Sequence, residues 1–277
     1  MIFVCKIWEV INLRKKIYVI IVILILLGIS SNSMALTVKN SKQSSTGITL
    51  YVGGSGLGNH STIQEAILNA TNGDTIFVFS DSSPYNEHIS IYKQISIIGE
   101  NKDTTVIDGN GTGIIVSITE PDVIMKEFTI QNGNTGIEVD GSCDNVSIQH
   151  MIITDCSEIG LDVNGFNEFL IIEYNIIKNC KNASSFTGTS YSKINHNSFE
   201  NSEYGLVFNL WCNQNQIHFN NFLNNEKDAF FFTSVLNNWI FNYWDRPHIL
   251  PKPIVGLVFI FPFLNFDWRP LLRPADI

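Results

Sequence analysis

Hydrophobic side chains recur at a nearly constant interval through the middle of the chain. One apolar residue per interval, each 22 to 24 residues after the last, gives the series Met125, Ile148, Ile172, Ile194, Ile217 and Ile240. A period of about 20–50 residues is typical of proteins built from stacked structural repeats. The spacing therefore predicts one solenoid domain in which each interval forms one coil.

Inside each interval, apolar and polar positions keep a fixed register. The fifth residue after the recurring one is apolar in five intervals, at Ile130, Ile153, Ile177, Phe199 and Phe222. The seventh is an amide or a carboxylate, at Asn132, Asp155, Asn179, Asn201 and Asn224. Apolar residues two apart share a face on a strand but not on a helix, so the coils should consist of short strands. Stacking at about 4.8 Å per coil would bring the polar column together, and we expect it to form a hydrogen-bonded ladder.

One segment departs from this strand pattern. Ser61 or Thr62 can cap a helix, and Glu65 stands where a capping box needs an acidic residue. The apolar residues that follow are spaced for one helical face, at Ile63, Ala66, Ile67 and Ala70. The sequence thus predicts a single helix over residues 62–70.

The first 35 residues have the features of an export signal. Basic residues at 14–16 precede an uncharged apolar run over residues 17–29, and small residues at Ser33 and Ala35 suit cleavage after Ala35. The alternative is that residues 17–29 remain as an N-terminal anchor, although a span needs about 20 apolar residues. Residues 36–48 are small and polar, which indicates a linker. An exported chain can carry glycans on Asn-x-Ser/Thr sequons, which occur at Asn59, Asn69, Asn110, Asn145 and Asn182.

The last part of the chain, residues 246–277, leaves the repeat and is rich in proline and aromatic residues. Its apolar run over residues 254–264 is too short for a membrane span and contains Pro262. We expect this tail to cover an outward apolar strip formed by Phe186, Val207 and Phe231 and to close the last coil, because an open apolar end would aggregate.

The net charge of the chain limits the classes of partner that it can bind. The chain has 26 acidic and 17 basic residues, a formal net charge of −9. Nucleic-acid binding requires a basic surface, so we exclude a nucleic-acid partner. Contact with a membrane is expected only through the N-terminal segment.

Two acidic residues fall at the same position of neighbouring coils, Glu138 and Asp162. Carboxylates about 5 Å apart occur in retaining glycosidases, and they could also bind calcium; the alternative is two solvated surface acids. There is no arginine between Val123 and Asn238, which argues against a lyase that needs a basic residue beside its acids.

The positions of the histidines and cysteines in the repeat determine which of them could share a metal ion or form a disulfide. His150 and His196 share a column but lie two coils apart, so no metal site is predicted. Cys156 and Cys180 occupy the same position in adjacent coils, and a Cα separation near 4.8 Å lies within the range for a disulfide. Zinc is not expected, because the cysteines have no CxxC spacing.

Aromatic side chains gather in the second half of the chain and could stack on sugars. We expect Trp239 and Trp244 to pack in the core and the C-terminal cap. Trp211 stands in a turn and is the best candidate for an exposed ligand-binding residue, together with Tyr191 and Tyr204.

The segment GENKDTTVIDG at residues 99–109 and the Ile-x-x-Asn-x-Phe-x-x-Asn coils that follow resemble right-handed parallel β-helix repeat proteins. The resemblance covers about residues 50–245 and is strongest to exported, NosD-type proteins of archaea, also called carbohydrate-binding and sugar-hydrolase (CASH) repeats. It implies an all-β fold: a single right-handed parallel β-helix of about seven or eight coils over residues 49–245. The helix at 62–70 would cap the first coil, and residues 246–277 would cap the last.

This repeat carries enzymes, metal-handling proteins and surface proteins, so the fold does not give the function. The sequence favours an exported cell-surface or secreted module without catalytic activity, which binds glycans or cell-envelope components or serves a structural role. The alternatives are a polysaccharide hydrolase or lyase that uses Glu138 and Asp162, and a NosD-like protein that handles copper. No cofactor is expected, except that calcium could bind the acidic pair.

Overall fold

The computed structural model describes residues 47–277. The export signal or anchor expected over residues 1–35 lies outside the described residues, and so does the linker up to residue 46. Within residues 47–277, no helix is both long and apolar enough to cross a membrane.

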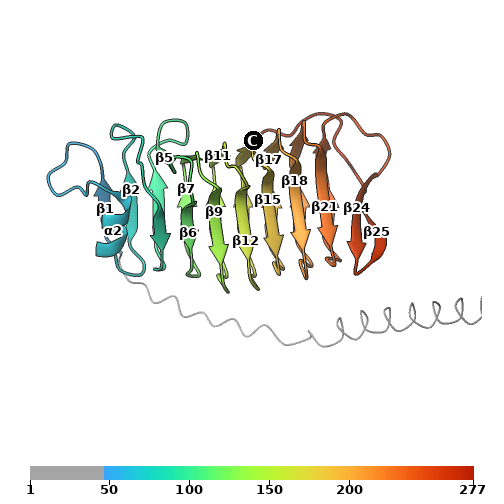
Figure 1. The fold of residues 1–277 in the computed structure, drawn as a ribbon, viewed down its shortest axis with the longest axis horizontal. Coiled ribbons are helices and arrows are strands. Elements are labelled where there is room, and N and C mark those ends of the chain that lie inside the picture. The colour runs from blue at the N-terminus through green and yellow to red at the C-terminus, as the bar shows by residue number, and fades with distance from the viewer. Residues whose placement is uncertain (1–46) are drawn as a thin grey trace, which may run out of the picture. The chain divides into compact units, whose positions relative to one another are not determined.

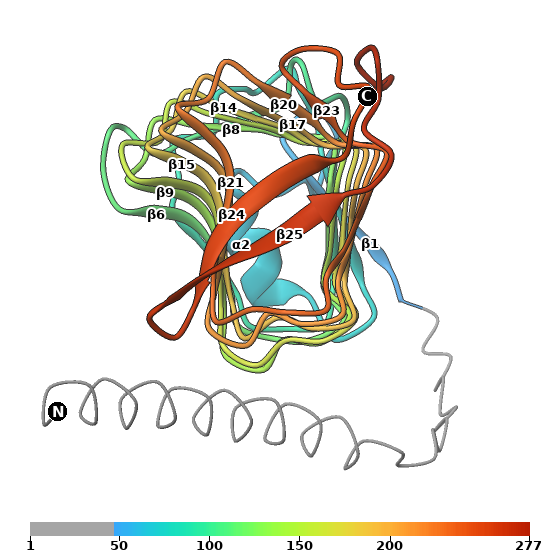
Figure 2. The ribbon, with the colours of Figure 1, turned by 90° about the vertical axis from the view of Figure 1, so that its right-hand side faces the viewer.

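The chain winds as a parallel β-solenoid with three sheets, and each regular turn passes from sheet A to sheet B to sheet C (Figures 1 and 2). Sheet A has nine strands, so the solenoid has about nine turns, slightly more than the seven or eight predicted. The strands of sheet A are β1 (Thr49–Val52), β2 (Thr75–Val78), β4 (Ser96–Gly99), β7 (Ile124–Lys126), β10 (Ser147–Gln149), β13 (Ile171–Glu173), β16 (Lys193–Asn195), β19 (Gln216–His218) and β22 (Asn238–Ile240).

Sheets B and C complete the turns, and all neighbours pair in parallel except the last two strands of sheet C, β24 and β25. Sheet B consists of β5 (Val106–Asp108), β8 (Thr129–Gln131), β11 (Ile152–Thr154), β14 (Ile176–Lys178), β17 (Ser198–Glu200), β20 (Asn221–Leu223) and β23 (Tyr243–Trp244). Sheet C consists of β3 (Ile89–Ile91), β6 (Ile114–Ile118), β9 (Thr135–Asp140), β12 (Ile159–Asn164), β15 (Asn182–Thr187), β18 (Tyr204–Asn209), β21 (Lys227–Phe232), β24 (Lys252–Val258) and β25 (Phe261–Asp267).

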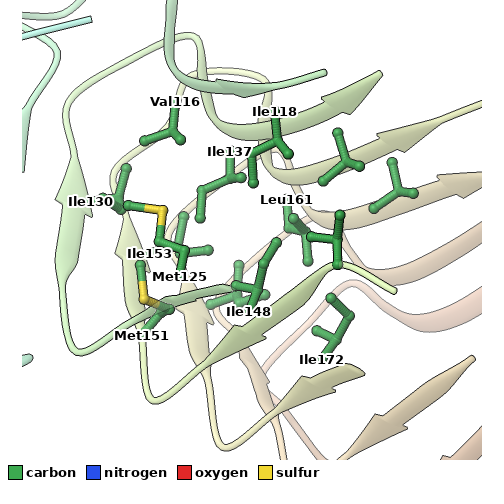
Figure 3. Close-up of a cluster of buried hydrophobic side chains, with 14 of the residues drawn as sticks. Val116, Ile118, Met125, Ile130, Ile137, Ile148, Met151, Ile153, Leu161 and Ile172 are labelled. Carbon is green, nitrogen blue, oxygen red and sulfur yellow. The ribbon is translucent and has the colours of Figure 1, made fainter. Parts of the chain in front are cut away.

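The recurring apolar residues form a buried column inside the solenoid. Met125, Ile148 and Ile172 are register partners on adjacent strands and are fully buried (Figure 3). In the last coil the partner of Ile217 is Trp239, and Ile240 pairs with His218 on the outer side. The assignment of Ile240 to the core column was therefore wrong by one residue, because this coil is one residue shorter.

The polar column seven residues after the repeat forms the corners between sheets B and C. Asn132, Asp155, Asn179, Asn201 and Asn224 all have positive φ, between 49° and 59°. Asparagine and aspartate adopt this left-handed conformation more readily than other non-glycine residues, which explains their recurrence. Some of these side chains contact the next coil, as Asn179 Nδ2 does by donating to Asp155 Oδ1 at 3.2 Å, but they lie at the surface.

The buried ladder lies elsewhere, three residues after the repeat. Asn197 Oδ1 accepts from the backbone N–H and from Nδ2 of Asn175 at 3.1 and 3.0 Å. Asn220 accepts from Asn197 in the same way, at 2.9 and 3.1 Å, and Asn242 accepts from Asn220. All four asparagines are fully buried. The prediction of an asparagine ladder was correct in kind but wrong in position.

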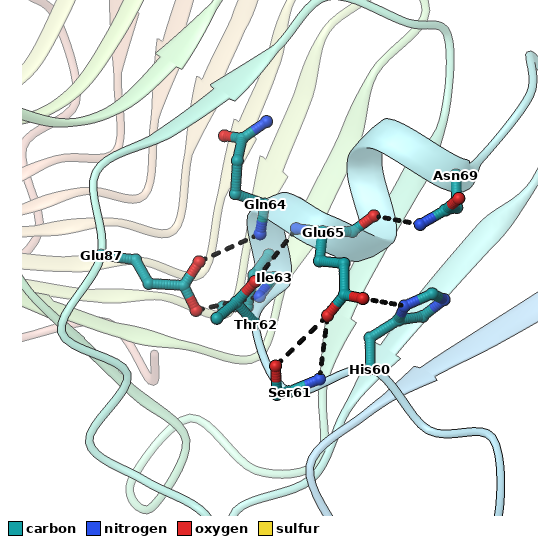
Figure 4. Close-up of polar contacts among 8 residues, drawn as sticks. All are labelled: His60, Ser61, Thr62, Ile63, Gln64, Glu65, Asn69 and Glu87. Atoms are coloured by element: carbon teal, nitrogen blue, oxygen red, sulfur yellow. Dashed lines mark hydrogen bonds and ion pairs between the residues drawn. The ribbon is translucent and has the colours of Figure 1, made fainter.

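The predicted helix closes the first turn as α2 (Ile63–Asn69). Thr62 is the N-cap, and its side chain accepts from the Glu65 N–H at 3.1 Å. Glu65 reaches back to the Ser61 N–H and hydroxyl, at 3.3 and 3.2 Å, and these hydrogen bonds hold the pKa of Glu65 below its usual value. Glu87 accepts from the first backbone N–H groups of the helix, so its carboxylate neutralises the exposed helix end (Figure 4).

The C-terminal residues close the other end with an antiparallel hairpin, β24 and β25. β24 joins sheet C through Phe231 and Phe232, and Gly256 allows the close crossing because a Cβ there would meet Phe231 O at 2.3 Å. The tail therefore covers the end of the solenoid. Of the strip that the sequence suggested, it contacts Phe231, against which the Phe263 ring packs edge-on.

That strip was itself misassigned. Phe186 and Phe231 are fully buried inside the solenoid. The outward column that begins with Glu138 and Asp162 continues through Ser185, Val207 and Phe230. The change from acidic to apolar residues along this column is retained. Of its five members, the sequence placed Glu138, Asp162 and Val207 correctly.

Candidate functional site

Exposed aromatic side chains line the turns that lead from sheet C to sheet A in three consecutive coils. We call Phe166, Phe169, Tyr191 and Trp211 the aromatic row. Phe166 is 72% exposed and Trp211 is 53% exposed. Clusters of exposed aromatic side chains on the surface of a soluble protein often mark a binding site.

The backbone of these turns determines how the row is presented. Gly188 has φ +72°, and a Cβ added there would meet Gly165 O at 2.4 Å and the Phe166 ring at 3.4 Å. The coil after Phe166 thus carries no side chain at this point. Phe166 lies against that bare backbone, and Trp211 follows on the next coil.

The left-handed conformation recurs at the other members of the row. Phe169 and Tyr191 both have positive φ, 60° and 55°, and their rings stack with centroids 5.8 Å apart. Trp211 also has positive φ, 66°, and its backbone N–H donates to Thr233 O at 2.9 Å. The turns are therefore fixed by backbone hydrogen bonds, and the aromatic side chains are held outward.

Polar groups lie within the same turns. Glu168, Ser190 and Asn213 pair across successive coils as isolated bridges. Burial and the neighbouring Asp144 carboxylate raise the pKa of Glu168. Aromatic faces beside hydroxyl, amide and carboxyl groups are the combination that binds sugars, since the rings cover the apolar face of the sugar and the polar groups meet its hydroxyls.

Tyr204 does not join the aromatic row. It begins β18, at the opposite end of that strand from Trp211. Lys227 Nζ donates to the Tyr204 hydroxyl at 2.7 Å and lies 4.6 Å from its ring centroid. The Tyr204 ring is thus engaged by a lysine of the next coil, and the structure brings only Tyr191 and Trp211 of the three predicted residues together.

The acidic pair lies on the outer face of sheet C. Glu138 and Asp162 are register partners on β9 and β12. Burial, followed by the charges of Asp140 and Asp162, raises the pKa of Glu138. Burial also raises the pKa of Asp162, although Asn164 donates to it at 2.9 Å. The two carboxyl groups therefore lie on neighbouring strands with raised pKa values, as acid catalysts do. The next residues of the same column, Ser185, Val207 and Phe230, add no further carboxyl group.

A second set of rings forms a continuous stack at the corner between sheets A and B. Centroids of successive rings lie 4.9 to 5.1 Å apart, with interplanar angles of 4° to 20°. Each inner ring has both faces covered by its neighbours, so this stack supports the fold and offers sugars no open face. The stacked residues are His150, Tyr174, His196, Phe219 and Phe241.

Cys156 and Cys180 lie at equivalent positions of adjacent coils, three residues after the register partners Ile153 and Ile177. The structure contains them as free, buried thiols, as it does Cys143 and Cys212. The disulfide stays a prediction. Of the five sequon asparagines, three are exposed, namely Asn69, Asn110 and Asn145.

Sequence reasoning missed Phe166 and Phe169. They flank Asn167 and Glu168 in the turn after β12, and Gly165 directly precedes Phe166. An aromatic residue directly after a turn glycine was the available signal, but the sequence does not show which way a turn side chain points.

Comparisons with known proteins agree with this architecture. A family model described as "Periplasmic copper-binding protein (NosD)" matches residues 40–259. No curated protein matches the chain. Among solved structures, XylC in complex with xylose is similar with a TM-score of 0.56 and 12% identity over 70% of this chain, which spans 65% of XylC, slightly less than two thirds. An alginate lyase from Paenibacillus sp. str. FPU-7 is more distant, with a TM-score of 0.44 and 14% identity over 72% of this chain and 88% of the lyase. At 12% identity, the likeness to XylC shows the fold alone.

Proposed function

The chain belongs to the NosD family, and on that basis we propose that it is an exported, non-catalytic β-solenoid that binds a glycan or a cell-envelope polysaccharide through the aromatic row. The observation that carries the proposal is the row itself. Four aromatic side chains are exposed in the same turn of three consecutive coils, with hydrogen-bonding groups between them. The periplasmic description of the family supports export.

The charge of this surface indicates the ligand class. Glu168 and Asp144 lie beside the row, and the chain has no arginine between Val123 and Asn238. An acidic polysaccharide would meet like charge there, and no guanidinium group is available to pair with its carboxylates. We therefore propose a neutral glycan.

Affinity electrophoresis tests this proposal. The protein is run through gels that contain soluble neutral polysaccharides (xylan, glucomannan, dextran) or alginate as the acidic case. Retardation by at least one neutral polymer is expected, together with its loss in Trp211→Ala and in Phe166→Ala. Tyr92→Ala removes an exposed aromatic residue outside the row and should be retarded like the wild type. Equal retardation of all three variants would refute the site.

A polysaccharide hydrolase is the second candidate, because the acidic pair has raised pKa values on neighbouring strands. Retaining glycosidases place two such groups about 5 Å apart and keep one protonated. Calcium bound by the same oxygens is a further proposal. Both ideas predict that Glu138→Gln and Asp162→Asn change the behaviour towards polysaccharide, whereas the aromatic-row proposal does not.

The family is described as copper-binding, and a copper site would need ligand side chains that converge on one point. Histidine, cysteine and methionine are the usual copper ligands. Within residues 47–277, no three His, Cys, Asp or Glu side chains converge as a metal site would require. His150 and His196 are held apart by the ring of Tyr174. The described residues therefore do not fit a copper centre, and we derive no step through copper.

A further inference from the structure

The C-terminal end of the solenoid presents an apolar sheet face whose side chains are largely exposed among residues 47–277. The hairpin β24–β25 lies across the last turn (Figure 2), and its inner face packs on the core through Ile254. Directly opposite residues of an antiparallel pair share a face. The register puts Val255 opposite Leu264 and Leu257 opposite Pro262, so the outer face is made of apolar side chains. Burial of the whole 254–264 run, which the sequence suggested, does not occur.

The hairpin turn is apolar as well. Val258 pairs with Phe261, which leaves Phe259 and Ile260 as a two-residue connection. Ile260 is 81% exposed, and Phe259 has φ +55°. Such turns normally contain asparagine, aspartate or glycine, since a bulky residue in the left-handed region costs about 1–2 kcal/mol. Phenylalanine and isoleucine are poor choices for a turn that faces only water.

Charge distinguishes this end from the coils. Residues 47–245 contain 23 acidic and 7 basic side chains, whereas residues 246–277 contain two acidic and four basic ones. Asp267 is buried, while the three arginines of this segment are exposed, and none of the ion pairs among residues 47–277 involves an arginine. The exposed arginines are Arg246, Arg269 and Arg273.

We propose that this end face docks onto an anionic lipid bilayer surface. Phe259, Ile260 and the outer face of the hairpin would enter the boundary between headgroups and acyl chains, and the arginines would meet the lipid phosphates. Trp268, which is exposed beside the hairpin, has the amphipathic ring that favours this depth. The sequence had restricted membrane contact to the N-terminal segment, whereas this surface is formed by the C-terminal residues. Thr233 links it to the aromatic row, because Trp211 donates its backbone N–H to Thr233 O and Phe259 donates its backbone N–H to Thr233 Oγ1.

A second copy of the chain is the other occupant to consider. A symmetric contact would place the basic rims of two copies against each other, and like charges across an interface are unfavourable. Strand addition along the free edge of β25 is opposed by Pro262, which has no N–H to donate. An anionic headgroup layer complements the same features.

The test uses the full chain with Cys5→Ser and Ile260→Cys, labelled with the environment-sensitive dye nitrobenzoxadiazole. The other four cysteines are buried and should not react. Vesicles consist of phosphatidylcholine alone or of equal parts phosphatidylcholine and phosphatidylglycerol. The control label is at Leu57→Cys, which is fully exposed near the opposite end of the solenoid.

The dye at residue 260 should brighten and shift to the blue with the anionic vesicles, and the dye at residue 57 should not. Phe259→Ser and Leu264→Ser should each weaken this binding about tenfold, and Arg269→Gln and Arg273→Gln about fivefold each. These exposed changes should leave thermal stability unaltered. No response at residue 260, an equal response to both vesicle types, or a concentration-dependent response without lipid would overturn the proposal, the last in favour of a second copy.

Discussion

Asn242 donates both its backbone N–H and its side-chain Nδ2 to one oxygen of Asp267, at 2.9 and 3.0 Å. The Trp244 indole donates to the same oxygen at 3.1 Å, and the Arg269 N–H donates to the other oxygen at 3.1 Å. Each asparagine of the ladder donates to the asparagine of the next coil. The last one, Asn242, therefore needs an acceptor beyond the ladder. A carboxylate can accept without donating, so Asp267 from the C-terminal hairpin ends the ladder and joins the cap to the coils.

Replacing Asp267 should therefore loosen the C-terminal cap. Asp267→Ala leaves several buried N–H groups without an acceptor, and the expected loss in free energy of unfolding is about 3 kcal/mol or more. Urea denaturation measures the loss, and hydrogen exchange at the Asn242 amide should accelerate first, because solenoids can fray from their ends. Asp276→Ala, an exposed change in the same tail, should have no effect. Equal exchange rates in the two variants would contradict this role.

The two asparagine columns should differ in cost. Asn197→Leu removes a fully buried amide that both donates and accepts between coils, and we expect a loss of about 3 kcal/mol in unfolding free energy. Asn201→Leu changes only an exposed corner residue with φ 49°, where the expected loss is about 1 kcal/mol from left-handed strain. Denaturant unfolding of the two variants measures both losses. A larger loss of unfolding free energy in Asn201→Leu would show that the corner column, and not the buried one, is the stabilising ladder.

The sequence pattern was sufficient for the solenoid but not for every column. Regular spacing identified the core column from Met125 to Ile217, because strands of one sheet must stack in register. The burial of Trp239 and Trp244 was expected from their place near the C-terminal cap and not from the spacing. Ile240 and Phe231 were misplaced because apolar residues stand side by side there, and the pattern does not show which one faces inward. Phe186 was misplaced because the step from Asp162 to Ser185 is one residue shorter than the step from Glu138 to Asp162. The buried ladder was missed because Asn197 and Asn201 have the same chemistry, and only the backbone shows which one turns a corner. For the site, Trp211 could be predicted from its place in a turn, whereas the pattern around Phe166 does not show which way its side chain points.

Stability should depend on pH through the acidic pair. Glu138 and Asp162 have pKa values raised above the ordinary values near 4, so the folded state binds their protons more tightly than the unfolded state does. Their ionisation as the pH rises from about 4 through the raised pKa values therefore removes stability. Asp162→Asn should raise the melting temperature at pH 7 and reduce the change in stability over that window. Asp103→Asn, in an exposed turn, is the control, and a lower melting temperature of Asp162→Asn at pH 7 would show that the carboxylate is needed in its charged form.

The stacked cysteines should form a disulfide upon oxidation. Strands of adjacent coils are about 4.8 Å apart, which lies within the usual range of about 4.4–6.8 Å for the Cα atoms of a disulfide, and Cys156 and Cys180 occupy equivalent positions of two such coils. Treatment with oxidised glutathione, which is reduced as the two thiols lose their hydrogens, should give a linked peptide in a non-reducing digest analysed by mass spectrometry. The linked peptide should be absent from Cys180→Ser. A protein that retains both thiols, or that links Cys143 to Cys212, would disprove the pairing.

Binding without cleavage is the central claim, and one assay measures both. The protein is incubated with the neutral polysaccharides and with alginate, with and without calcium, and retention on the polymer and new chain ends are recorded together. We predict retention on a neutral polymer that Trp211→Ala abolishes, with no new chain ends in any sample. New chain ends that disappear in Glu138→Gln and Asp162→Asn would contradict the account and identify the protein as an enzyme.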